Sequence, residues 1–206
     1  MQRKLLFDYL ICRNFAKQLM KDGEEVAYQS AMEENYLAEK DRMAGSEAHY
    51  NFFESLISGR DLNSQDQTVG DNFRRIFPAQ VLKDCVMAST IRRVLETAGE
   101  KDKLLVIAGR GHLEHGFGVP ERVDRHHLIE ENQSCIITVR DRADLDTDQP
   151  LEGLGKVDMF EVQYPGDYIL LYEDTPEESD VKEEISAAYD RVAETAKIEG
   201  FLTISQ

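Results

Sequence analysis

The sequence predicts an α/β protein in which a small, mainly parallel sheet is flanked by helices and preceded by a helical N-terminal region. A long helical segment is followed, after a short polar turn, by the apolar run Leu104 to Ala108. Helix, turn and buried strand form half of an α/β unit. Two further short runs, Cys135 to Val139 and Tyr168 to Tyr172, are rich in the β-branched, aliphatic and aromatic residues typical of strands.

The N-terminal region is predicted to be helical because apolar residues recur at spacings of three to five from Gln2 to about Ile57, and no proline occurs before Pro78. Lys21-Asp22-Gly23 is expected to end a first helix. A second helix then covers about residues 24 to 43, and Gly45-Ser46 begins a third.

A polar loop divides this region from the rest of the chain. Residues 59–71, GRDLNSQDQTVGD, contain loop-forming residues and little apolar content. We therefore predict a helical region at residues 1–58, a loop at 59–71 and an α/β domain at 72–206. In the last of these, Pro78 opens a helix that runs to about Ala98.

The C-terminal part is predicted to contain an exposed acidic loop between the two later strands and a final helix. That helix has Thr175 as N-cap, Pro176 in its first turn and Gly200 as terminator. Its apolar stripe is expected to pack on the sheet.

Composition excludes several classes of protein. Forty acidic residues against 24 basic ones give a net charge of −16, which would repel nucleic acid and anionic lipid. The longest apolar runs are far short of the roughly 20 residues of a membrane span. We therefore expect a soluble chain that neither binds nucleic acid nor crosses a membrane.

The sequence does not determine the cellular compartment of the protein. Asp8 and Arg13 interrupt the apolar N-terminus, which favours a helix over a signal sequence. An organelle or the periplasm would fit if a targeting segment had been removed before residue 1. The three cysteines are widely spaced and form no CxxC pair, which indicates a reducing compartment or inert buried thiols. Because no CxxCH occurs, any haem would be held non-covalently.

The predicted functional centre is the segment Leu104 to Pro120, LLVIAGRGHLEHGFGVP, a buried strand leading into a glycine-rich loop. Open α/β sheets place ligand sites at the carboxyl ends of strands, and glycine lets the backbone approach a ligand closely. The alternative is a tight turn that only redirects the chain. Glu114 stands where GxGxxG needs its third glycine, and no GK[ST] follows, so nucleotide binding is disfavoured. The glycines of this loop are Gly109, Gly111, Gly116 and Gly118.

Two histidines in the loop are candidate ligands. His112 and His115 would share a face if this turn were helical, and neutral imidazole suits haem iron, zinc or copper. HLEH lacks the HExxH spacing of zinc peptidases. The alternative is that His112 bonds to the backbone beneath the turn and that His115 is solvated. His49, His126 and His127 are interpreted as surface residues.

Other polar residues have two interpretations each. Asp84 lies beside the apolar stripe of its helix, where it could contact the glycine loop or a ligand, or could be an exposed charge. Arg74 and Arg75 could bind propionates or a phosphate, although a solvated pair explains them as well. The tyrosines that could supply a phenolate ligand are better explained by packing. They are Tyr36, Tyr50, Tyr164, Tyr168 and Tyr172.

With these residues considered, Pro78 to Val123 resembles the carboxyl half of the ChaN-like haem-binding uptake family, part of the Tiki superfamily. The family pattern is AQ, an Asp followed by MA, a helix, a buried strand ending in AGxGH, and then GVP with a basic residue. Gly166-Asp167-Tyr168 resembles the family's later strand entry. The matching positions are Ala79-Gln80, Asp84, Met87-Ala88, Ala108-Gly109, Gly111-His112, Gly116, Gly118-Val119-Pro120 and Arg122.

The resemblance implies an α/β domain that binds haem or iron in a cleft at residues 109–120, with His112 as the metal ligand. The family's early strand and GE-x-H type motif have no counterpart before residue 78, and relatives commonly carry an aromatic residue where this chain has His115. We therefore take as candidate cofactor-binding residues Gly109, Gly111, His112, His115, Gly116, Gly118, Pro120, Asp84 and Met87.

Three hypotheses follow. The preferred one is a non-enzymatic protein that binds haem, iron or another small ligand. The second is a Tiki-type hydrolase that binds a divalent metal through His112 with Glu114 or Asp84. The missing first half removes partner ligands that such a hydrolase needs. The third is a scaffold subunit that keeps the fold without an active site and belongs to a homo-oligomer or a larger assembly.

Overall fold

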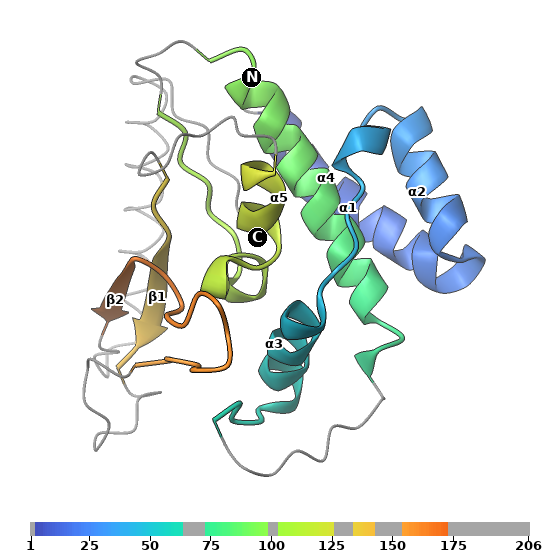
Figure 1. Ribbon diagram of the computed structural model, residues 1–206. Helices are drawn as coiled ribbons and strands as arrows, with labels where there is room; N and C mark the ends of the chain where they lie inside the picture. Colours follow the sequence, from blue (N-terminus) through green and yellow to red (C-terminus); the bar gives the residue numbers. More distant parts are fainter. Residues whose placement is uncertain (1–2, 64–72, 99–102, 126–133, 143–153, 173–206) are drawn as a thin grey trace, which may run out of the picture.

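The computed structural model describes residues 3–63, 73–98, 103–125, 134–142 and 154–172 (Figure 1). The N-terminal elements are α1 (Arg3–Asp22), α2 (Glu24–Glu33), the 3-10 turn η1 (Glu39–Asp41) and α3 (Glu47–Ser58). They are followed by α4 (Phe77–Leu95), the 3-10 turns η3 (Arg110–His112) and η4 (Glu114–Gly116), α5 (Val119–Asp124), and the strands β1 (Ile137–Asp141) and β2 (Tyr168–Tyr172).

The predicted α/β class is confirmed: β1 and β2 form a two-stranded parallel sheet, with Ile137 opposite Tyr168 and Asp141 opposite Tyr172. Helix α4 runs through the middle of the described structure, with α1 and α2 on one side of it and α5 between it and the sheet (Figure 1). No helix in the described ranges is both long enough and apolar enough to span a bilayer.

The N-terminal helices follow the prediction at most of their ends. Helix α1 ends at Asp22, and α3 begins at Glu47 after Ser46, whose hydroxyl accepts a hydrogen bond from the backbone N–H of His49 at 3.0 Å. Helix α2 ends at Glu33 rather than near residue 43, since Asn35 adopts a left-handed φ of 60°. Asparagine is among the few residues that adopt this conformation readily.

Helix α4 forms the central part of the core. Side chains around most of its circumference are buried, and one cluster joins it to Phe15, Leu19, Tyr28 and other residues of α1 and α2. The predicted apolar stripe is therefore only part of its buried surface. Residues from both sides of the predicted boundary at 59–71 contribute to this cluster, and the boundary itself stays a prediction.

The predicted strand at Leu104 to Ala108 is wrong. Residues 103–109 belong to no helix or strand, and Leu105 is 40% exposed. Leu104 and Val106 instead pack against a small cluster formed by α4 and α5. The apolar run therefore buries one side against the helices and leaves the other side exposed, unlike a strand that is buried on both faces. The sequence analysis also missed α5, although Pro120 near its start and Glu121 at N3 are typical helix-start signals.

The two later strands form where they were predicted, with β1 shifted by two residues to Ile137–Asp141. The packing explanation fails for three of the tyrosines. Tyr164, Tyr168 and Tyr172 are exposed, whereas Tyr50 is buried and Tyr36 packs against Phe15. The predicted final helix from Thr175 to Gly200 lies outside the described residues.

Candidate functional site

The candidate site begins with Asp84, in the middle of α4. Its side chain is fully buried, and Oδ1 lies 2.5 Å from Nδ1 of His112 in the glycine-rich loop. The interpretation of Asp84 as an exposed charge is therefore wrong. Its contact with the loop runs through the His112 side chain and not through the backbone.

This contact determines which nitrogen of His112 is available. An ionised carboxylate can only accept, so Nδ1 of His112 donates to Asp84 and Nε2 keeps its lone pair. The amide nitrogen of Gln80 also lies 2.8 Å from Nδ1. It cannot donate to a protonated Nδ1 and donates instead to the Gly111 carbonyl at 3.1 Å. Among the described residues Nε2 has no hydrogen-bond partner, and the His112 side chain is 17% exposed.

Gly118 holds the loop against the backbone of His112. It has a φ of +74°, and a Cβ at this position would lie 2.7 Å from the carbonyl oxygen of His112. Both its conformation and this close approach require glycine. Gly111 is packed less tightly, because a Cβ there would meet the end of the Leu56 side chain at 3.3 Å.

The interpretation of His49 as a surface residue is wrong. Its side chain is fully buried beneath the loop, with Nε2 3.7 Å from Oδ2 of Asp84 and Nδ1 3.4 Å from Oε1 of Glu121. A helical position beside Tyr50 and Phe53 was the one signal that could have indicated burial.

The comparison with known families covers the same residues. Residues 10–123 match the family described as "Haem-binding uptake, Tiki superfamily, ChaN". This chain belongs to that family. No curated protein and no solved structure matches the chain significantly.

The family match corrects the extent of the resemblance. We had limited it to Pro78 to Val123 and left the N-terminal helices outside. The match begins at residue 10, so α3 with His49 belongs to the family region together with α4 and the loop. The match ends at residue 123, where the resemblance found in the sequence of this ChaN family member also ends.

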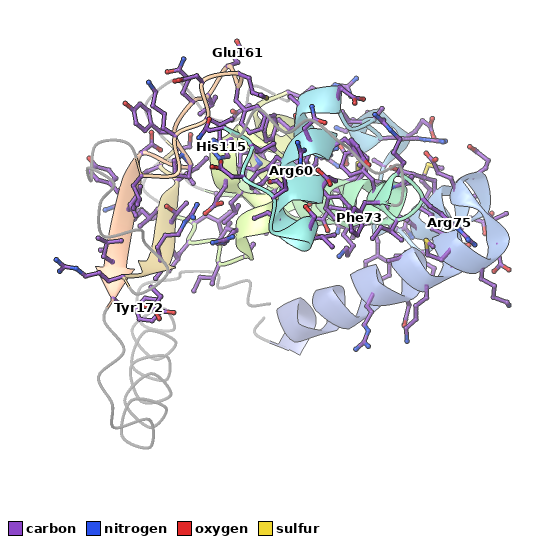
Figure 2. All side chains as sticks on the ribbon, turned by 90° about the horizontal axis from the view of Figure 1, so that it is seen from below. Arg60, Phe73, Arg75, His115, Glu161 and Tyr172 are labelled. Carbon is purple, nitrogen blue, oxygen red and sulfur yellow. The ribbon has the colours of Figure 1, made fainter. Side chains whose placement is uncertain are left out.

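His115 lies away from His112, because its left-handed φ of 58° breaks the helical turn and the two side chains do not share a face. Its buried ring contacts Phe52, Phe117 and Phe160, so it is not the solvated side chain of the alternative interpretation. Figure 2 shows it inside the mass of side chains, whereas Tyr172 lies at the end of the sheet. Burial lowers the pKa of His115, and a hydrogen bond to the Val162 carbonyl offsets this only in part.

Glu114 is paired with the sheet and not with His112. Its buried carboxylate accepts a hydrogen bond from Arg140 of β1 at 2.9 Å. Burial raises the pKa of Glu114, although the charges of Arg140 and Arg110 favour its ionised form. This ion pair connects the loop to β1.

The remaining candidates lie around this centre. Met87, one turn beyond Asp84 on α4, is half-buried against the same cluster as Leu113 of the loop, and Pro120 lies in the first turn of α5. Arg74 pairs with Glu47 and covers the ring of Tyr50, while Arg75 is exposed. His126 and His127 lie outside the described residues.

Proposed function

We propose that this protein binds haem non-covalently at the loop of residues 109–120, with Nε2 of His112 as the ligand to the iron. The observation that carries the proposal is the contact between Asp84 and Nδ1 of His112. A histidine that ligates a metal commonly donates its other N–H to a carboxylate, which fixes the ring and makes the ligating nitrogen more basic.

The donor set suits haem better than a hydrolytic metal. The porphyrin supplies four nitrogens, so one protein imidazole is enough to hold the iron. A catalytic zinc site needs three protein ligands. In the described ranges, no three His, Cys, Asp or Glu side chains are placed to hold a metal ion. The divalent-metal hydrolase therefore has less support than haem binding.

The walls of the site are proposed from the same loop. Gly118 lets the loop lie against the backbone of His112, and Gly109 and Gly111 belong to the same turn as His112. Gly116 faces Val162 and lies outside these walls. Met87 and Pro120 complete the set of candidate contacts, whereas His115 is enclosed by Phe52, Phe117 and Phe160 and lies outside it. Bound haem would offer iron as the acceptor for the lone pair of His112, and Asp84 would hold the proton on the opposite ring nitrogen.

Titration of the protein with hemin tests this proposal. The protein should shift the Soret band of hemin, and His112→Ala should weaken binding by at least tenfold, since it removes the ligand. Ser89→Ala is the control, because Ser89 lies on the same helix and bonds to Asp41. It should bind hemin as the unmodified protein does. A protein that causes no Soret shift, or a His112→Ala variant that binds as tightly, would contradict the proposal.

A further inference from the structure

Four side chains from three helices and the loop form one connected polar chain beneath the candidate site. Glu121 of α5 faces His49 of α3 at 3.4 Å, His49 faces Asp84 of α4 at 3.7 Å, and Asp84 contacts His112. Both carboxylates accept and cannot donate, so a hydrogen bond across either gap has His49 as its donor, and a neutral His49 can donate across only one of the two. The family motif and the proposed ligand contact account for Asp84 and His112 but not for His49 or Glu121.

The aromatic residues around His49 fix the orientation of its ring. The ring stacks on Phe117 at an interplanar angle of 5° and meets the edge of Phe77 at a centroid distance of 5.0 Å. The side chain has no exposed surface. Held between these rings, its two nitrogens point along the chain toward Asp84 and Glu121.

The far end of the chain is anchored. Oε1 of Glu121 accepts hydrogen bonds from the backbone N–H of Gly118 and from Arg122. Burial favours the neutral acid, but the neighbouring His49 and the charge of Arg122 outweigh it, so the pKa of Glu121 is lowered. Glu121 is therefore a carboxylate that holds His49 from the side opposite Asp84.

Asp84 needs a second partner. Oδ1 contacts His112, while the buried Oδ2 has no hydrogen bond within the described part of the chain. Both nitrogens of the buried His49 side chain lack one there as well, and Nε2 faces Oδ2 at 3.7 Å, slightly too far for a hydrogen bond. Nε2 of His49 is the donor that faces Oδ2. A buried carboxylate with one unpaired oxygen is costly, and it could turn away from His112 unless another group restrained it.

We propose that His49 is a positioning residue for His112. It holds Oδ2 of Asp84, so that Oδ1 keeps accepting from Nδ1 of His112 and Nε2 stays available as the ligating nitrogen. This inference rests on the proposed haem function, but its structural part concerns the ligand-free protein and can be tested alone.

The test is histidine ¹⁵N NMR of the ligand-free protein. In the unmodified chain His112 should be protonated at Nδ1 with a free Nε2, and His49 should carry a proton on Nε2. His49→Phe keeps the ring packing and removes both nitrogens, so His112 should become a mixture of tautomers. Ser89→Ala, on the same helix as Asp84, is the matched control and should leave the His112 signals unchanged.

Haem affinity gives the second readout. Outer-shell partners of a metal ligand typically change affinity by 10–100-fold. His49 acts through Asp84, so His49→Phe should weaken hemin binding by about tenfold, at the low end of that range.

Two results would overturn the inference: an unprotonated Nε2 on His49 in the unmodified protein, or unchanged His112 signals in His49→Phe. If His49→Phe does not fold, the ¹⁵N signal of His49 Nε2 in the unmodified protein still tests the inference, because it shows whether that nitrogen carries a proton. Failure of the unmodified protein to bind hemin would overturn the proposed function and leave the NMR test of His49 intact.

Discussion

The carboxylate of Asp84 lies 2.5 Å from Nδ1 of His112, which joins the centre of α4 to the glycine-rich loop. The contact links two parts of the family motif that are separated along the chain by the second half of α4 and by the segment that leads into η3, where His112 lies. It also assigns the proton of the imidazole to the nitrogen that faces the core.

Replacement of Asp84 by asparagine tests the contact itself. The amide keeps the shape of the side chain but loses the charge that favours the N–H of His112 at Nδ1. Hemin affinity should fall about 10–100-fold, as for other outer-shell carboxylates, and absorbance titration measures it. Ser89→Ala, which removes a hydrogen bond elsewhere on α4, is the control. Equal hemin affinities of Asp84→Asn and the unmodified protein would show that Asp84 does not contribute to ligand binding.

Gly118→Ala tests the close approach of the loop to His112. The added Cβ would meet the His112 carbonyl at 2.7 Å, and φ is +74°, so the substitution should cost about 1–3 kcal/mol in the free energy of unfolding and displace His112. Urea unfolding and hemin titration measure the two effects.

Gly116→Ala is the control that introduces backbone strain without displacing His112. Gly116 has a similar φ of +72°, but its Cβ would meet only Val162, at 3.6 Å. This variant should lose about 1–2 kcal/mol through strain alone and keep its hemin affinity. If both variants lost affinity equally, the specific contact between Gly118 and His112 would be excluded as the cause.

His115 should make stability depend on pH. Burial lowers its pKa below 6.5 in the folded protein, so the unfolded chain binds more protons once the pH falls below about 6.5. Its contribution is therefore fully present above pH 6.5 and is lost as the pH falls toward the lower, folded pKa. His115→Phe keeps an aromatic ring among Phe52 and Phe160 and cannot titrate.

Urea unfolding at several pH values measures this effect. The unfolding free energy of the unmodified protein should fall more steeply than that of His115→Phe between about pH 7 and pH 5. Because other titrating groups are common to both proteins, the difference between the two curves reports on His115. A difference that stays constant over this range would show that His115 does not titrate as its burial indicates.

The buried ion pair between Asp41 and Arg92 should hold η1 against α4. Arg92 binds both carboxylate oxygens, and its side chain is 7% exposed. Asp41→Asn leaves the buried cation with only the partly exposed Glu96 as its counter-ion and should lower the free energy of unfolding by about 3 kcal/mol, the low end of the cost of breaking a buried pair. Arg42→Gln, which breaks the exposed pair with Glu25, should have a much smaller effect in the same urea unfolding experiment. Equal losses would show that burial does not determine the strength of these pairs.

The sequence predicted the elements that local signals define. Apolar spacing indicated α1, α3 and α4, and Ser46 marked the start of α3 as its N-cap. The strand run at Tyr168 to Tyr172 was predicted at its exact bounds. The motif around Asp84 and His112 placed two residues in one site, and the structure shows them in contact.

The errors arose where tertiary contacts decide the outcome. An apolar run such as Leu104 to Ala108 has the same composition whether it pairs with strands or packs on helices, and here it packs on α4 and α5. The burial of His49 depends on Asp84 and Glu121, which lie on other helices. No local pattern in α3 specifies those partners.

Pulsed EPR of the ferric haem complex, prepared with protein labelled with ¹⁵N in its histidines, tests the central claim most directly. We expect hyperfine coupling from one strongly bound histidine nitrogen, present in the unmodified protein and in Ser89→Ala and absent in His112→Ala. A haem complex without histidine coupling, or with coupling that survives in His112→Ala, would contradict the assignment of His112 as the ligand.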